Sequence, residues 1–218
     1  MNAAIIGATG LVGKQLLRRL VADERYQNVW VLGRRAPTFD DPKLVFQSIE
    51  LDTLEQLTCP FPIDHGFCCL GTTMKQAGSK AAFCAVDQDA VIQFTQLCNA
   101  SKTAVITALG ADANSRVFYN KIKGETELKL TTWALEQAKA LLLVQPSLLL
   151  GQRSHSRILE DIGQYLMPVI APLMLGHLAQ YRPIKAEIVA EAMLFTLHKM
   201  EPKTISTLNN LKMLNMKL

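Results

Sequence analysis

Short apolar runs alternate with amphipathic segments along the first two thirds of the 218-residue chain. Continuous runs of Val, Ile, Leu and Ala predict strands that are covered on both faces, and apolar positions spaced three to four residues apart predict helices between them. The predicted strands are 3–6, 28–32, 43–49, 66–70, 103–107 and 141–144, and the predicted helices are 10–22, 80–100 and 118–137. This alternation favours an α/β fold with a doubly wound parallel sheet.

The pattern changes after residue 151. It predicts helices at 157–165 and 187–199 and a strand near 204–208, with an apolar run at 165–175 that is broken by two prolines and is too short to span a membrane. We therefore expect a single domain over 1–218, with its core at 1–151 and a small, mostly helical C-terminal appendage at 152–218. The appendage could cover a substrate pocket, meet a protein partner or a second copy of the chain, or lie on a membrane surface.

Composition narrows the class of protein. The chain is 49% hydrophobic and 19% charged, with a net charge of +4, which fits a folded globular protein. Its basic residues are scattered, so a nucleic-acid partner is not expected. The five cysteines form no C-x-x-C pair and the four histidines lack ligand spacing, so we expect neither a disulfide framework nor a metal site. Because the N-terminus does not resemble a secretory signal, we expect a cytoplasmic location.

A glycine triplet opens the first predicted helix directly after the first predicted strand. In this position the first glycine permits a tight turn, the second allows the backbone to approach a diphosphate, and the third allows close packing of helix and strand. The alternative is a glycine-rich turn without a ligand. We expect the loop to hold a dinucleotide through Gly7, Thr9, Gly10, Leu11, Val12 and Gly13.

The end of the second predicted strand distinguishes the two nicotinamide dinucleotides. An acidic side chain here would bind the ribose 2′-hydroxyl of NAD, but the strand is followed by Arg34 and Arg35, and the first acid is Asp40. Two guanidinium groups can form charge-assisted hydrogen bonds with the 2′-phosphate of NADP. We therefore expect NADP in preference to NAD, although two solvated arginines after a strand remain the simpler alternative.

Tyr119 and Lys123 are four residues apart on a predicted helix and so share one of its faces. An ammonium near a phenol favours the phenolate and would move the pKa of Tyr119 towards neutrality, as suits an acid/base group in hydride transfer. Thr107 ends a central strand and could orient a substrate through its hydroxyl. The alternative is that Tyr119 is a core residue, Lys123 a solvated neighbour and Thr107 an ordinary strand residue.

Four motifs in this order carry a family resemblance: the glycine triplet, residues 67–73, residues 109–112 and the Tyr119/Lys123 pair. Together they resemble an atypical short-chain dehydrogenase/reductase of the Tat-interacting-protein-like branch and its bacterial relatives. The resemblance implies a Rossmann fold, Tyr119 as acid/base, and Lys123 binding the nicotinamide ribose. It also implies that the cofactor lies against Leu70, Gly71, Thr72, Pro146 and Ser147.

Two features depart from that family. Thr107 stands where the family usually has a serine, and its extra methyl group restricts χ1. The wider family uses an asparagine in the preceding helix for a proton relay, but residues 82–97 contain none, so the sequence does not support a water-mediated relay. The acidic residues of these helices are expected to be solvated charges; they are Asp87, Asp89, Glu125 and Glu127.

These observations predict an NADP(H)-dependent oxidoreductase acting on a small carbonyl or alcohol. One alternative is a regulatory or redox-sensing module that binds NADP(H), has a protein partner and turns over little or nothing. Another is a sugar-nucleotide epimerase or dehydratase, which would share the Tyr/Lys pair but normally has a larger C-terminal lobe.

Overall fold

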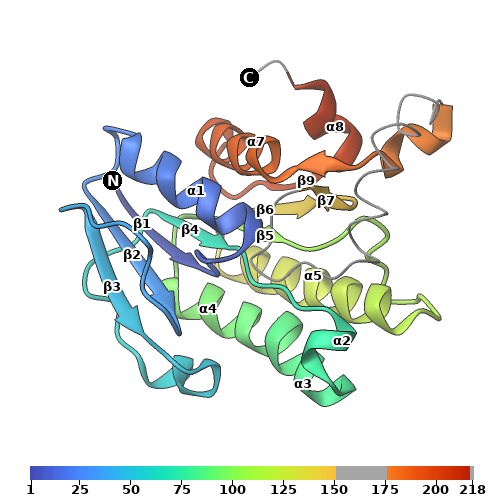
Figure 1. Ribbon diagram of the computed structural model, residues 1–218, viewed down its shortest axis with the longest axis horizontal. Helices are drawn as coiled ribbons and strands as arrows, with labels where there is room; N and C mark the ends of the chain where they lie inside the picture. The colour runs from blue at the N-terminus through green and yellow to red at the C-terminus, as the bar shows by residue number, and fades with distance from the viewer. Residues whose placement is uncertain (151–175, 217–218) are drawn as a thin grey trace.

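The computed structural model describes residues 1–150 and 176–216. Within them, seven parallel strands form one sheet in the order β3–β2–β1–β4–β5–β6–β9 (Figure 1). The predicted doubly wound parallel sheet is confirmed. The strands are β1 (Asn2–Ile6), β2 (Asn28–Gly33), β3 (Leu44–Ser48), β4 (His65–Cys68), β5 (Lys102–Ile106), β6 (Ala140–Gln145) and β9 (Ile205–Asn209).

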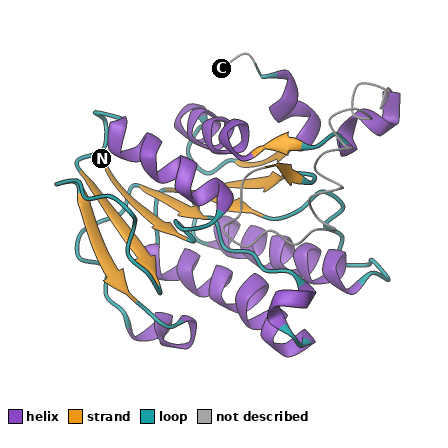
Figure 2. Cartoon of the chain, viewed as in Figure 1, coloured by secondary structure: helices purple, strands orange, loops and turns teal. Residues whose placement is uncertain are grey.

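Helices cover both faces of the sheet (Figure 2). The main helices are α1 (Leu11–Ala22), α4 (Ala90–Cys98), α5 (Phe118–Glu136) and α7 (Ala186–Lys199). Helices α1 and α7 pack together on one face, and α4 and α5 cover the other (Figure 1). The shorter elements are α2 (Met74–Ala77), α3 (Lys80–Cys84), α8 (Asn210–Asn215) and a separate pair of strands, β7 (Leu149–Leu150) and β8 (Ile184–Lys185).

The alternation of side chains along each strand divides the core into two layers. In β1, Ala3 and Ile5 join the cluster beneath α1 and α7, whereas Ala4 and Ile6 join the cluster beneath α4 and α5. All four side chains are 0–1% exposed. Because both faces of the strand are buried, its sequence is an uninterrupted apolar run.

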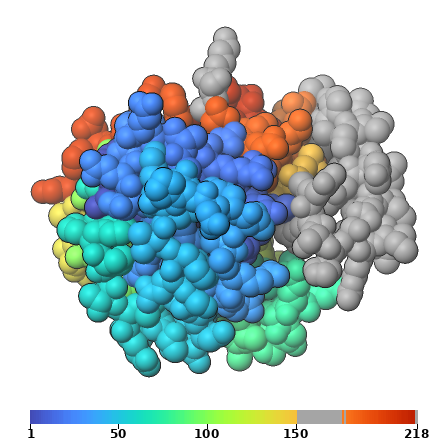
Figure 3. All heavy atoms as spheres, turned by 60° about the vertical axis from the view of Figure 1, so that its left-hand side comes forward, coloured from blue at the N-terminus to red at the C-terminus, as the bar shows by residue number. Residues whose placement is uncertain are grey.

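The strand order reverses at β1. The chain passes from β1 to β2 and β3 on one side, then crosses to β4 on the other side of β1. In doubly wound sheets ligands bind beyond the carboxyl ends of the strands at such a reversal. Figure 3 looks onto the side formed by the first part of the chain, drawn in blue and cyan.

The helix predicted at 80–100 contains an irregularity that the sequence did not indicate. Between α3 and α4 lies a π-helical segment, Ala85–Asp89. Such segments are rare and are frequently found at functional sites. This one carries Asp87, which is completely buried.

Part of the segment expected as an appendage extends the sheet itself. Strand β9 pairs in parallel with β6, with Thr207 opposite Leu143, and α7 packs against α1. Helix α7 is fixed there by a buried apolar face that includes Val189 and Met193. The predicted helix at 157–165 and the apolar run at 165–175 lie outside the described residues. Among the helices of 1–150 and 176–216, none has the length and hydropathy needed to cross a membrane.

Two histidines that are far apart in sequence meet at the amino ends of the strands. The hydroxyl of Tyr26 lies 2.7 Å from Nδ1 of His65 and 3.2 Å from Nε2 of His198. Burial, together with the nearby His198 and Lys102, lowers the pKa of His65 to about 4. The folded protein therefore holds His65 neutral at pH values where an unfolded chain would protonate it.

The pKa of His65 is lower in the folded protein than in the unfolded chain, so the unfolded chain takes up a proton first as the pH falls. The contribution of His65 to the free energy of unfolding is therefore fully present above pH 6.5 and is lost as the pH falls towards 4. Between pH 7.5 and 5 the free energy of unfolding should fall by about 2 kcal/mol from this group alone. Urea denaturation at both pH values, compared with the variant His65→Gln, isolates the contribution. An equal fall in the variant would assign the effect to other groups.

Candidate active site

The glycine loop joins β1 to α1 at the point where the strand order reverses. Gly7 has φ +79°, a left-handed conformation that favours glycine, and a Cβ atom there would lie 2.5 Å from the carbonyl oxygen of Cys69. A Cβ atom at Gly13 would lie 2.2 Å from the carbonyl oxygen of Gly7. Both glycines are therefore required for backbone segments to pack against one another.

The amino terminus of α1 is arranged to receive an anion. Gly10 is its N-cap and offers no side-chain cap, and its first turn contains no acidic residue. The amide of Lys14 donates to the carbonyl of Gly10 at 3.0 Å, so the preceding amides of Leu11, Val12 and Gly13 are the ones that an α-helix leaves without internal acceptors. The Val12 side chain is buried, so only its main chain can serve a ligand. A diphosphate fits this helix end.

A pocket of about 260 Å³ lies beside this helix end. It is formed by residues of the glycine loop and α1 together with the loop that follows β2, all in the blue part of the chain in Figure 3. Lys14, Arg18 and Arg35 line it with positive charge. Among the described residues, none of these three forms an ion pair within 4.0 Å. Sequence analysis missed Lys14 and Arg18, although their four-residue spacing on a helix could have indicated them.

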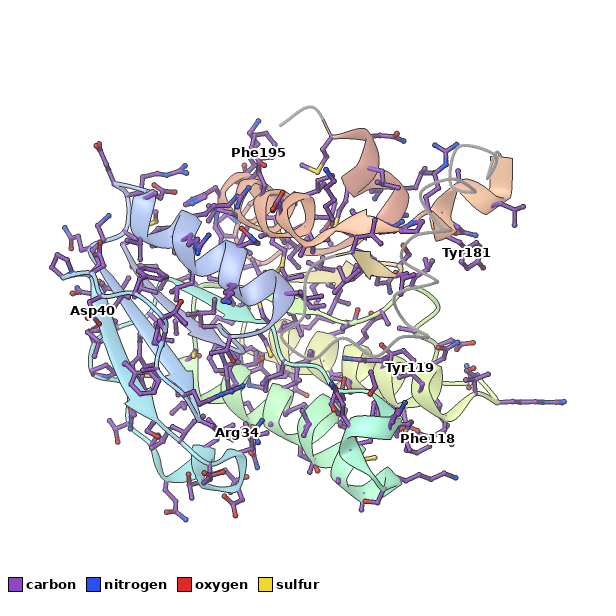
Figure 4. All side chains as sticks on the ribbon, in the orientation of Figure 1. Arg34, Asp40, Phe118, Tyr119, Tyr181 and Phe195 are labelled. Atoms are coloured by element: carbon purple, nitrogen blue, oxygen red, sulfur yellow. The ribbon has the colours of Figure 1, made fainter. Side chains whose placement is uncertain are left out.

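The two arginines after β2 differ in position. Arg35 lines the pocket, whereas Arg34 is exposed and is not among the lining residues. Figure 4 shows Arg34 near the arrowhead of β2 and Asp40 higher up at the left of the view, apart from it. The nearest acid in the sequence therefore does not face the side chain of Arg34.

Helix α5 presents Tyr119, Lys123 and Glu127 at four-residue intervals, in one row. The ring of Tyr119 packs against the buried ring of Phe83, with 5.6 Å between centroids. The helix is fixed closely by Gly124, where a Cβ atom would lie 2.1 Å from the amide nitrogen of Ala113. This contact explains a glycine in the interior of a helix, where it otherwise costs stability.

Lys123 is 2% exposed and forms an ion pair with Asp87, with 2.7 Å between Nζ and Oδ1. The other carboxylate oxygen of Asp87 accepts a hydrogen bond from the amide of Thr72 at 2.8 Å. The expectation that Asp87 is a solvated charge is therefore wrong. A buried ammonium needs a counter-charge, and the π-helical segment supplies it. By contrast, Asp89 in the same segment is exposed.

The electrostatic balance at Tyr119 differs from the expectation. Burial raises the pKa of its phenol above the ordinary value, Lys123 lowers it and Asp87 raises it, and the net direction is upward. The shift towards neutrality expected from Lys123 is wrong for the protein without cofactor, because burial of the phenol raises its pKa more than Lys123 lowers it, and Asp87 adds to the rise. Tyr119 is thus held protonated over the neutral range.

Thr107, directly after β5, is 4% exposed and donates a short hydrogen bond to Glu127. The amide of Gln145, at the end of β6, donates to both oxygens of Glu127 at 2.9 and 3.0 Å. Glu127 was expected to be solvated, but these bonds hold it between two strand ends. Sequence analysis missed it, although its spacing of eight from Tyr119 places it in the same row.

The remaining residues expected at the cofactor lie on two loops. Leu70, Gly71 and Thr72 follow β4, next to the glycine loop, and the Thr72 amide is bound to Asp87. After β6, Pro146 is buried, and the hydroxyl of Ser147 donates to the carbonyl of Arg182. The Ser147 hydroxyl is therefore already used within the protein.

The parallel sheet and the glycine loop at its carboxyl end define the class of this protein, which is a Rossmann protein of the dinucleotide-binding type. No family model matches the sequence. Protein HTATIP2 of Rattus norvegicus is 33% identical over 160 residues, which cover 70% of this chain and 64% of that protein. Protein FMP52, mitochondrial, of Eremothecium gossypii is 32% identical over 70% of this chain and 68% of that protein. The chain belongs to their NAD(P)-binding atypical short-chain dehydrogenase/reductase family, and the resemblance inferred from the motifs is confirmed.

Solved structures agree at the level of the fold. Bordetella bronchiseptica WbmF, in complex with NAD+, superposes with a TM-score of 0.69 at 14% identity, covering 94% of this chain and 72% of that one. Serine dehydrogenase from Escherichia coli gives a TM-score of 0.63 at 14% identity over 95% and 96% of the two chains.

The expectation of a cytoplasmic location is wrong. Fungal relatives from Eremothecium gossypii, Emericella nidulans and Coccidioides immitis are named mitochondrial proteins. The expectation rested on the lack of a secretory signal and on unpaired cysteines, and neither feature distinguishes the cytosol from another reducing compartment.

The buried ion pair makes Asp87 critical for stability. Asp87→Ala should lower the free energy of unfolding by about 3 to 5 kcal/mol, because Lys123 is left buried without a counter-charge. Asp89→Ala, in the same segment but exposed, is the matched control and should stay within about 0.5 kcal/mol. Urea denaturation measures both. Similar small losses in the two variants would contradict the pairing.

Proposed function

We propose that this protein is an NADP(H)-dependent oxidoreductase that acts on a small carbonyl or alcohol. The observation that carries the proposal is the position of Tyr119, Lys123 and Thr107 at the edge of the sheet where the glycine loop lies. The fold alone would not assign an activity, because it serves many unrelated functions. The proposal therefore rests on these side chains and on the helix end beside them.

The bound dinucleotide would supply or accept the hydride. Tyr119 would supply the proton to the substrate oxygen, and its raised pKa keeps it protonated and so favours carbonyl reduction at neutral pH. Lys123, held by Asp87, would bind the nicotinamide ribose and limit the rise in the pKa of Tyr119. Thr107 would orient the substrate oxygen. Leu70, Gly71, Thr72, Pro146 and Ser147 would line the cofactor's path.

The preference for NADP is supported by the charge of the pocket beside α1. A ribose 2′-phosphate needs cationic donors, and Lys14, Arg18 and Arg35 line one pocket in which none of the described lining residues is a carboxylate. In NAD-binding relatives of this fold the corresponding group is acidic. Arg34 would contribute from the exposed side.

Replacing both Arg34 and Arg35 by Ala should weaken NADPH binding by about 1.5 to 3 kcal/mol, because charge-assisted hydrogen bonds to the 2′-phosphate are lost. NADH affinity should change little. Of the single variants, Arg35→Ala should have the larger effect because Arg35 lines the pocket. Calorimetric titration of both dinucleotides measures this, with Lys129→Ala on the exposed side of α5 as the control. Equal weakening of NADPH and NADH would argue against the assignment.

A second candidate is an NADP(H)-binding regulatory module with a protein partner. It is favoured by one observation: in the free protein, Lys123 is bound to Asp87 and the Thr107 hydroxyl to Glu127, so two groups of the proposed chemistry are already engaged. A sensor would need the glycine loop but not Tyr119.

Tyr119→Phe separates the enzyme from the sensor. It should leave NADPH affinity nearly unchanged and reduce turnover of an aldehyde or ketone by roughly 100- to 10,000-fold, because the proton donor is lost. Nicotinamide absorbance over a carbonyl panel, together with NADPH titration, measures both quantities. Unchanged turnover would remove Tyr119 from the mechanism. NADPH binding without turnover by the wild-type protein would favour the sensor.

A further inference from the structure

Glu127 is a carboxyl group at the proposed site with no role in the mechanism above. It follows Tyr119 and Lys123 in the row along α5, and it is bound from two adjacent strand ends by Thr107 and Gln145. Its position is therefore fixed by three elements of the fold. A carboxyl group held so firmly against the hydroxyl that would orient the substrate can control that hydroxyl.

The protonation state of Glu127 decides where the Thr107 hydroxyl can donate its proton. A threonine hydroxyl has a single proton to donate, and an ionised carboxylate can only accept. When Glu127 is ionised, it takes the proton of Thr107. When Glu127 is protonated, it can donate to Oγ1 of Thr107, and the threonine proton becomes free. The other acceptor within reach is the carbonyl of Val144, at 3.3 Å, which is beyond the usual range for a strong O–H···O bond.

We propose that Glu127 is a positioning residue that acts through Thr107. Ionised Glu127 holds the hydroxyl proton away from the substrate, and protonated Glu127 releases that proton to bind the carbonyl oxygen that Tyr119 protonates. The inference rests on the proposed oxidoreductase function. It adds no covalent step. The Thr107 proton stays on its hydroxyl and changes only its hydrogen-bond acceptor, and the proton that the substrate receives still comes from Tyr119.

The surroundings of Glu127 support a carboxyl group that changes protonation nearer neutrality than usual. Burial raises its pKa, the bonds from Thr107 and Gln145 and the charge of Lys123 lower it, and the net direction is upward. Thr107 from β5 and Gln145 from β6 are uncharged, and Lys123 is the cation that faces it from α5. The charge of Lys123 is in turn offset by Asp87.

The first experiment needs no substrate. Carbon-13 NMR of labelled glutamate carboxyl groups follows the titration of Glu127, whose signal is assigned by its absence in Glu127→Gln. Thr107→Val should raise the pKa of Glu127 further, because the hydrogen bond to the ionised form is lost. Thr107→Ser, which keeps the hydroxyl, should not. An unchanged titration in Thr107→Val would overturn the inference.

The second experiment is a pH profile of carbonyl reduction. In the wild type, kcat/KM should fall up to tenfold per pH unit above the pKa of Glu127. In Glu127→Gln the amide nitrogen can donate to Thr107 and the amide oxygen can accept from Gln145, so this fall should disappear. Glu125→Gln, which alters a surface pair with Lys121, is the matched control and should keep the wild-type profile.

The two experiments separate the failure of this inference from the failure of the proposed function. A protein that reduces no carbonyl, but whose Glu127 responds to Thr107→Val as expected, would lose the proposed activity and keep the hydrogen-bond control. A protein that reduces carbonyls, but whose pH profile is the same in Glu127→Gln and the wild type, would keep its activity and lose the control by Glu127.

Discussion

The architecture depends on backbone segments approaching more closely than side chains would allow, at the point where the strand order reverses. Gly7 lies against the carbonyl of Cys69, and Gly13 lies against the carbonyl of Gly7. A side chain at either position would push α1 or the loop after β4 away from β1. The same contact places the first amides of α1 at the carboxyl end of the sheet, so the packing constraint also positions the proposed anion site.

A second constraint is electrostatic. Lys123 and Asp87 are both buried, and a charge removed from water is tolerated only when it is paired. Pairing requires the helix before β5 to bring a carboxylate to α5, and the π-helical segment Ala85–Asp89 is where it does so. The pair also connects to the loop proposed to contact the cofactor, since Asp87 accepts a hydrogen bond from the amide of Thr72. One ion pair thus joins two helices and a loop around the proposed site.

The chemistry of the site is set by pairs more than by single residues. Lys123 does not act on Tyr119 alone, because burial raises the pKa of Tyr119 more than Lys123 lowers it, and Asp87 adds to the rise. The hydroxyl of Thr107 is likewise not independent, because it donates its proton to Glu127. A residue pattern singles out Tyr119, Lys123 and Thr107 as candidates, but their properties depend on two carboxylates, Asp87 and Glu127, that the sequence analysis expected to be solvated.

The sequence by itself determined the parallel sheet, the glycine loop and the row on α5, because these depend on local spacing: alternating apolar runs, glycines three apart and side chains four apart. Only the tertiary structure placed β9 beside β6, gathered Lys14 and Arg18 around the pocket with Arg35, buried Asp87 against Lys123 and bound Glu127 to Thr107. A charged residue on a helix has the same local pattern whether it faces water or a partner. Which of the two occurs is decided by the helix or strand that packs against it. The partner of Asp87 is Lys123, 36 residues further along the chain, and the partner of Glu127 is Thr107, 20 residues earlier.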